Sequence, residues 1–169
     1  MTRQALHVRG DLVLHPVALA GLVVLLLNDH VLKAAAPSWV TGKLSDVAGL
    51  AFFPFLLLAG WEVLTGRTPT VRAASSAGAT TAVVFAAVKL SDVARDAYAD
   101  VVGVLRLPVD AVLSGASAPV DVVIQPDATD LLALVSCAAV VLVVRQSVRR
   151  TSASAVVRAA GAASGTDAP

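Results

Sequence analysis

Charged residues are scarce in this chain, and this scarcity excludes most soluble protein classes. Only 15% of the 169 residues are charged, whereas 57% are hydrophobic, and the mean hydropathy is +0.79. Soluble domains carry about 25% charged residues. The deficit therefore places the chain among integral membrane proteins.

Cysteine and net charge are also nearly absent, and each absence excludes a class of function. The single cysteine, Cys137, cannot form an internal disulfide, and one cysteine does not make a thiolate metal site. It lies inside an apolar run, where we expect it to be a small buried hydrophobic side chain. The formal net charge is only +1, so no nucleic-acid partner is expected.

Long apolar runs are what the chain has in place of charge. They predict four transmembrane helices, over residues 12–32, 44–64, 73–90 and 129–146. The uncharged parts of the last three runs are shorter than the roughly 20 residues that cross a bilayer. The aspartates that flank them, Asp46, Asp92 and Asp130, are therefore drawn towards the membrane. Aspartate is too short to reach far back to the interface.

Basic residues are unevenly divided between the two sides of this topology. Eight of the 13 Lys and Arg residues fall on the side that holds both termini, and the other five fall on the opposite side. Cytoplasmic loops carry an excess of Lys and Arg. We therefore predict a multi-pass protein of the cell membrane with both termini cytoplasmic.

The connection between the third and fourth runs is long and acidic. Residues 98–113 are rich in Val and Leu but are interrupted by Asp100, Arg106 and Pro108. An extracytoplasmic interfacial segment fits this pattern better than a fifth span. The predicted fold is all-α, with a four-helix transmembrane domain over residues 1–148. Residues 149–169, rich in Ala, Ser and Gly, are expected to form a disordered cytoplasmic tail.

Polar residues gather at the predicted extracytoplasmic ends of all four spans. Ionisable residues at membrane depth are costly, so they indicate function by default. Helical spacing places several of them on a common face, such as Asp29 and Lys33 at i, i+4. The candidate site comprises Asp29, His30, Lys33, Lys43, Ser45, Asp46, Lys89, Asp92, Asp127, Thr129 and Asp130.

Helix capping offers a simpler explanation for part of this set. Ser45 with Asp46, and Thr129 with Asp130, would suit helix N-termini. Capping does not explain Asp92, because this residue would close the third span, and a helix C-terminus disfavours an anion. The sequence Lys-Leu-Ser-Asp-Val-Ala occurs at 43–48 and again at 89–94. The first copy is expected to open a span and the second to close one.

Three segments resemble a known family. They are NDHVLK at 28–33, TGKLSDVAGL at 41–50 and DATDLLAL at 127–134. Together they resemble small bacterial four-helix integral membrane proteins with no assigned function. Val47 stands where that family's pattern has Phe, and Ala128 stands where it has Pro. The resemblance implies a four-helix membrane protein with the same polar residues, and it implies no activity.

Three functions remain open from the sequence. The first is an outward-facing polar site that binds, or also transports, a small cation, a proton or a polar ligand. The second is a structural or accessory subunit whose Lys/Asp pairs fix helix packing. The third is a membrane-embedded metal- or carboxylate-dependent enzyme acting on an outer-leaflet substrate, which ranks lower because no known catalytic motif is present.

The partners follow from the membrane assignment. Besides the lipid bilayer, they are a second copy of the chain or a membrane partner subunit. The sequence requires no cofactor. The candidate metal ligands for the enzyme hypothesis are Asp29, His30, Asp46 and Asp130.

Overall fold

The computed structural model describes residues 8–36, 38–122, 124 and 126–164, and all regular structure in these residues is helical. Four helices are long and apolar enough to cross a membrane: Pro16–Ala35, Trp39–Thr65, Val71–Leu90 and Ala128–Ala155. They coincide with the four apolar runs of the sequence. The prediction of an all-α fold with four helices of spanning length is therefore confirmed.

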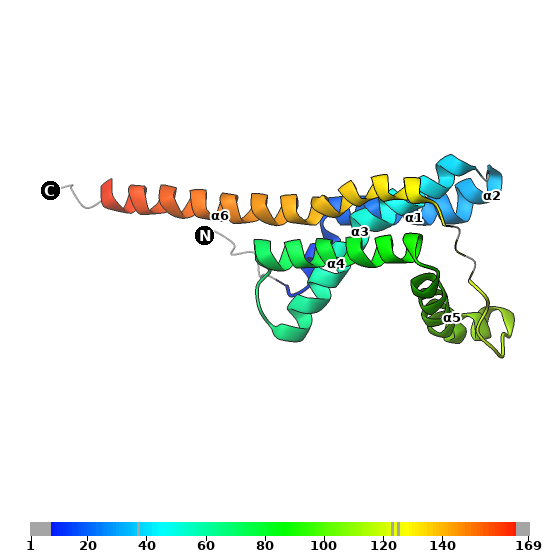
Figure 1. The fold of residues 1–169 in the computed structure, drawn as a ribbon. Helices are drawn as coiled ribbons and strands as arrows, with labels where there is room; N and C mark the ends of the chain where they lie inside the picture. The colour runs from blue at the N-terminus through cyan, green and yellow to red at the C-terminus, as the bar shows by residue number, and fades with distance from the viewer. Residues whose placement is uncertain (1–7, 37, 123, 125, 165–169) are drawn as a thin grey trace.

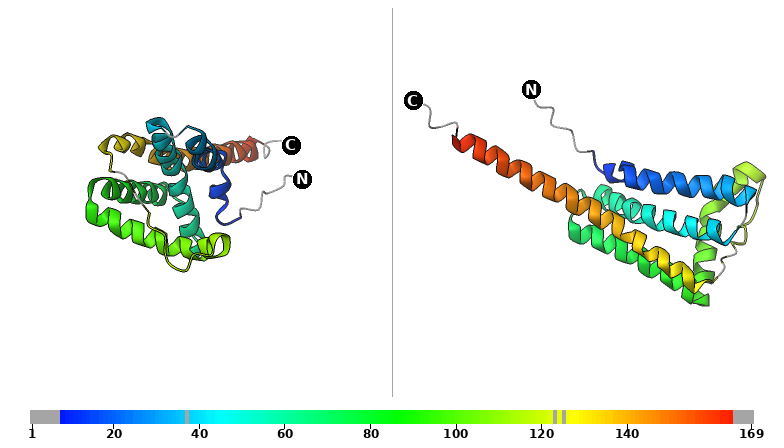
Figure 2. Two further views of the ribbon diagram at one scale, coloured as in Figure 1. Left: turned by 90° about the vertical axis from the view of Figure 1, so that its right-hand side faces the viewer. Right: turned by 90° about the horizontal axis from the view of Figure 1, so that it is seen from above.

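The helices run side by side, with one exception (Figures 1 and 2). In chain order they are η1 (Asp11–Leu14), α1 (Pro16–Leu27), η2 (Asn28–Leu32), α2 (Lys33–Ala35), α3 (Trp39–Thr65), α4 (Val71–Leu90), α5 (Asp92–Ser114), η3 (Ala128–Cys137) and α6 (Ala138–Ser164). The first span consists of α1, η2 and α2, and the fourth consists of η3 and α6. The exception is α5, which lies across the end of the bundle where α4 finishes.

Local capping sets the ends of the central helices. The Ser38 hydroxyl accepts a hydrogen bond from the Thr41 N–H, and the Thr41 hydroxyl accepts one from the Ser38 N–H, so α3 begins at Trp39. Gly66 ends α3 in the left-handed conformation, with a φ of 68°. Ser91 both terminates α4 and caps α5, accepting from the Ala94 N–H. These short connections make successive spans antiparallel.

Two interpretations of helix ends are wrong. Because α3 begins at Trp39, Ser45 and Asp46 lie inside the helix and do not cap it. Asp92 was expected at the C-terminal end of the third span. It lies instead in the first turn of the next helix, α5. The helix dipole favours an anion at that position. The helix dipole therefore explains Asp92, and capping does not explain Asp46.

The core of the bundle is apolar and closely packed. Phe55 and Leu58 of α3 are buried against Ala74 of α4 and Val140 of α6. Cys137 is buried and has a free thiol, as its apolar surroundings predict. Small residues allow close helix contacts in membrane proteins. A Cβ atom on Gly78 of α4 would lie 3.0 Å from the Cys137 carbonyl oxygen, so glycine sets the spacing between α4 and η3.

Helix α5 is amphipathic, and its two faces have different surroundings. Val101, Leu105, Val109 and Val112 follow helical spacing and are exposed. Gly103, on another face, is buried against the chain at Pro119 and Val120. An exposed apolar stripe on a helix lying across the bundle end is the pattern of an interfacial helix.

The C-terminal segment differs from its prediction. A disordered tail was expected over residues 149–169, but α6 remains helical to Ser164. Figure 2 shows this helix extending past the ends of the neighbouring spans. Residues 165–169 lie outside the described part of the chain.

The spacing of α4 and η3 gives a stability prediction. Gly78→Leu should lower the free energy of unfolding by about 1–3 kcal/mol, because the side chain meets backbone rather than a movable group. Ala79→Leu, at the exposed neighbouring position, is the matched control and should change it little. Thermal unfolding of the detergent-solubilised protein measures both. Equal destabilisation of the two variants would contradict this account of the contact.

Candidate functional site

Six polar residues from three spans meet at one end of the bundle. We call them the charged cluster: Lys43 and Asp46 of α3, Lys89 of α4, Asp127 before η3, and Thr129 and Asp130 of η3. Helix α3 begins at this end, α4 finishes there and η3 begins there. The antiparallel order of the spans therefore brings together residues that are far apart in the sequence.

Asp130 is the centre of the cluster. Its side chain is buried, and each carboxylate oxygen accepts from a different lysine. The Nζ of Lys43 lies 2.7 Å from Oδ1, and the Nζ of Lys89 lies 2.5 Å from Oδ2. One carboxylate thus joins α3, α4 and η3. Charge-assisted hydrogen bonds of this kind are the strong ones.

The remaining members contact one lysine each. The Nζ of Lys89 also donates to Oδ2 of Asp46 at 3.3 Å. The Nζ of Lys43 donates to the Thr129 hydroxyl at 2.5 Å and to Oδ2 of Asp127 at 3.4 Å. Hydrogen bonds from the side chain and backbone N–H of Thr129 lower the pKa of Asp127 below its ordinary value.

Two hydrogen-bonding positions of the cluster are left open. Within the described residues no donor reaches Oδ1 of Asp46, and Lys89 uses two of its three N–H groups on carboxylates. Asp46 and Lys89 are also the members that line a groove between α3 and α4. This side of the cluster therefore offers one acceptor and one donor next to each other.

The ion pairs of the cluster join different helices and do not join residues that are three or four positions apart on one helix. Lys43 and Asp46 are at i, i+3 but bind neighbouring helices and not one another. Asp92 lies outside the cluster: its side chain is 89% exposed and pairs with Arg95 at 2.6 Å. The structure therefore does not bring Asp92 together with the other candidate residues.

A second polar group lies on the other side of α3. Asn28 is fully buried and donates from Nδ2 to the Thr41 carbonyl and to the Ser45 hydroxyl, each at 2.6 Å. Ser45 donates in turn to Asp29 at 2.5 Å. Asp29 and Lys33 lie 2.7 Å apart, as their i, i+4 spacing predicts. These residues tie the first span to α3.

Asn28 is missing from the sequence-derived candidates, although a signal for it exists. An asparagine that directly follows a run of Val and Leu is costly in a membrane unless it is hydrogen-bonded. In this segment the candidate residues were chosen for their charge, so Asp29 and His30 were included and the uncharged Asn28 was not. Its Oδ1 atom is buried and has no partner within the described residues.

Irregular helix geometry coincides with this end of the bundle. Asn28–Leu32 forms a π-helical turn, and Ala128–Cys137 is a 3₁₀-helix. Both forms are less stable than an α-helix, long 3₁₀ runs are uncommon, and π turns occur frequently at functional sites. The two segments carry Asn28 and Asp130, the buried polar residues of the first and fourth spans.

The proposed metal ligands fall in separate places. His30 is exposed, and its Nδ1 lies 3.0 Å from the Leu26 carbonyl oxygen. Asp29 binds Ser45 and Lys33, whereas Asp46 and Asp130 face Lys89. The described residues contain no group of three or more His, Cys, Asp or Glu side chains positioned to hold a metal ion.

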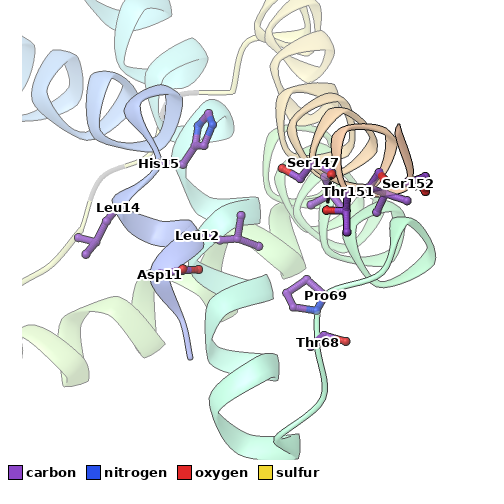
Figure 3. Close-up of a pocket in the computed structure, with 11 residues that line it drawn as sticks. Asp11, Leu12, Leu14, His15, Thr68, Pro69, Ser147, Thr151 and Ser152 are labelled. Carbon is purple, nitrogen blue, oxygen red and sulfur yellow. Dashed lines mark hydrogen bonds between the residues drawn. The ribbon is translucent and has the colours of Figure 1, made fainter. Parts of the chain in front are cut away.

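Among the hollows in the described part of the bundle, two bear on a ligand site. One of about 780 Å³ lies at the end opposite the cluster, between η1, the α3–α4 connection and α6 (Figure 3). Its hydroxyls Ser147, Thr151 and Ser152 donate to carbonyls of their own helix. His15 there accepts from the Val17 N–H and stacks on a phenylalanine of α3. Few polar groups are left for a ligand.

The other hollow, of about 400 Å³, is the α3–α4 groove. Its walls are one face of α3 and the second half of α4. Leu50, Phe53 and Leu57 line the α3 side, and Asp46 and Lys89 close one end. An apolar pocket with a few convergent polar groups is the usual form of a ligand site.

Comparison with known proteins adds no assignment. No family model matches the chain, and neither a curated protein nor a solved structure shows significant similarity to it. The geometry of the charged cluster is therefore the basis for a functional proposal.

The two aspartates at the start of η3 give a prediction. Asp130→Asn should lower the free energy of unfolding by about 3–5 kcal/mol, because two lysines lose their buried counter-charge. Asp127→Asn removes an exposed partner of Lys43 and should cost less than about 1 kcal/mol. Denaturant titration in detergent compares them. Similar losses for both variants would show that Asp130 is not the centre of the cluster.

Proposed function

We propose that this chain is a multi-pass protein of the cell membrane that binds a small polar group at the charged cluster. The observation that carries the proposal is the open edge formed by Asp46 and Lys89. Asp46 and Lys89 both line a groove, and within the described residues no side chain or backbone N–H donates to Oδ1 of Asp46. Besides its two carboxylate partners, the Lys89 Nζ lies 5.4 Å from the centre of the Phe85 ring, which leaves its third N–H without an oxygen acceptor. A group that both donates and accepts hydrogen bonds would satisfy the two together.

A polar ligand is supported better than a bare cation. Lys89 already occupies the space between Asp46 and Asp130, and Lys43 takes the other oxygen of Asp130. Asp46 and Lys89, the charged residues that line the groove, sum to zero charge. A metal ion would have to displace an ammonium group from its carboxylates.

Binding is also supported better than transport. Between the cluster and the opposite end, the described core consists of apolar residues such as Phe55, Leu58 and Val140. Glu62, buried further along α3, accepts from the Gly10 N–H at 3.1 Å. The polar residues of the two ends are thus separated by a packed apolar layer.

The extracytoplasmic side is proposed for the cluster on the distribution of charge. Arg67, Arg72, Arg145, Arg149 and Arg150 belong to the opposite end, where an excess of basic residues marks the cytoplasm. With that orientation α5 becomes the extracytoplasmic interfacial segment. We also propose that the chain belongs to the family of small bacterial membrane proteins that it resembles. A second copy of the chain or a membrane partner subunit is proposed as its protein partner.

A structural role is the second candidate, and Asp130 favours it. A single buried carboxylate that binds lysines of two other helices holds three spans in register. Buried polar groups can fix helix register at some cost in stability. On this hypothesis Asp46 matters only as a counter-charge for Lys89, and the open edge has no ligand.

The two Lys-Leu-Ser-Asp copies provide a matched test of binding. Native mass spectrometry of the detergent-extracted protein should detect a co-purifying small molecule on the unmodified chain. Asp46→Asn should abolish its retention, because the open acceptor and the charge balance are lost. Asp92→Asn, in the exposed second copy, should leave it bound.

The same experiment separates the two candidates. Asp46 contacts Lys89 at 3.3 Å, and Lys89 keeps Asp130 as its counter-charge when Asp46 is replaced, so Asp46→Asn should leave the melting temperature nearly unchanged. Loss of the bound species without loss of stability supports binding. Absence of any bound species, or its retention by Asp46→Asn, would reject the proposed function and leave the structural role.

A further inference from the structure

The α3–α4 groove has the position and length of a site for one lipid chain. It lies on helices of spanning length, and it contains exposed apolar residues of both walls, such as Phe53 and Val84. From Asp46 to Leu57 its α3 wall is about 16 Å long at about 1.5 Å per residue. The hydrocarbon core is about 30 Å thick, so the groove covers about one leaflet.

The polar end of the groove carries aromatic residues of the kind that gather at a membrane interface. Tyr98 of α5 lines the groove beside Asp46 and Lys89. Trp39, in the first turn of α3, is exposed, and its ring lies 4.8 Å from the Nζ of Lys43. Trp and Tyr concentrate where hydrocarbon meets head groups. A chain in the groove would therefore bring its head group to the charged cluster.

The charge of the cluster selects among head groups. The charged residues that line the groove, Asp46 and Lys89, balance, so an anionic head would meet the Asp46 carboxylate and a cationic head would meet the Lys89 ammonium group. A neutral hydroxyl can accept from Lys89 and donate to Oδ1 of Asp46 without changing that balance. The small exposure of the Lys89 side chain, 11%, suits a head of this size.

We infer that the α3–α4 groove binds a lipid with a neutral, hydroxyl-bearing head group, whose chain lies between α3 and α4 and whose hydroxyl bridges Lys89 and Asp46. This inference rests on the proposed function, since it names the class of ligand for the same open edge. The groove supplies apolar contact for the chain, and the cluster supplies orientation.

Photo-crosslinking in phosphatidylcholine vesicles tests the chain site. Three probes of equal length carry a diazirine in the chain and end in a hydroxyl, a carboxylate or an ammonium group. The alcohol probe should label α3 and α4 along the groove. Leu57→Trp, which fills the groove, should lower that labelling about tenfold, equivalent to about 1.4 kcal/mol of binding free energy.

The chain offers matched controls for this variant. Leu56 and Leu57 are both 45% exposed, but only Leu57 lines the groove, so Leu56→Trp should leave labelling unchanged. Val84→Trp and Val83→Trp form a second pair on α4, with only Val84 in the groove. Equal labelling within both pairs would overturn the inference.

The head group is tested with the same probes. The unmodified protein should prefer the alcohol to the other two, whereas Asp46→Asn, which removes the carboxylate beside Lys89 from the groove lining, should shift the preference to the carboxylate. No preference among the three probes on the unmodified protein would also overturn the inference. If a small molecule is retained through Asp46 while the groove stays unlabelled, the lipid inference fails and the proposed function stands. If neither is seen, both fail.

Discussion

The neutralisation of Asp130 is the constraint on which the polar end of this bundle depends. A buried carboxylate at membrane depth is costly unless it is paired and hydrogen-bonded. Its two partners come from different spans, so α3 and α4 must each present a lysine at the depth of the first turn of η3. Sliding either helix by one residue would move its lysine about 1.5 Å along the axis. One carboxylate therefore fixes the relative depth of three helices.

The spans could be predicted because the length and hydropathy of a segment depend only on its own residues. The four apolar runs and the amphipathic character of α5 can be read from composition and period alone. The start of α3 was placed too late, because the Ser38 cap precedes the apolar run and binds Thr41. The pairing of Lys43 and Lys89 was out of reach for a different reason. Spacing shows which residues share a face of one helix, and it does not show which neighbour that face meets.

The two copies of Lys-Leu-Ser-Asp show how far context outweighs local sequence. In the first copy all four residues lie within α3, and Asp46 turns towards Lys89. In the second, Ser91 interrupts the helix, and Asp92 starts α5 and stays in solvent. The residues after the two copies differ, since an apolar run continues α3, whereas Arg95 and Asp96 continue the amphipathic helix α5 across the bundle end. The lysine of both copies nevertheless reaches Asp130, because both lie at the same end of antiparallel helices.

Helix α3 connects the two polar groups, since neighbouring positions on it face different partners. Ser45 turns to Asn28 and Asp29 of the first span, and Lys43 turns to the residues at the start of η3. The first and fourth spans both become irregular at the same depth, through a π turn at Asn28 and a 3₁₀-helix at Asp130. Helical geometry that departs from the α form beside buried polar side chains indicates that their placement outweighs ideal backbone hydrogen bonding. The weaker backbone hydrogen bonding occurs at the end of the bundle where Asp46 and Lys89 line the groove. A polar group bound there would meet hydrogen-bonding partners that are already held in position.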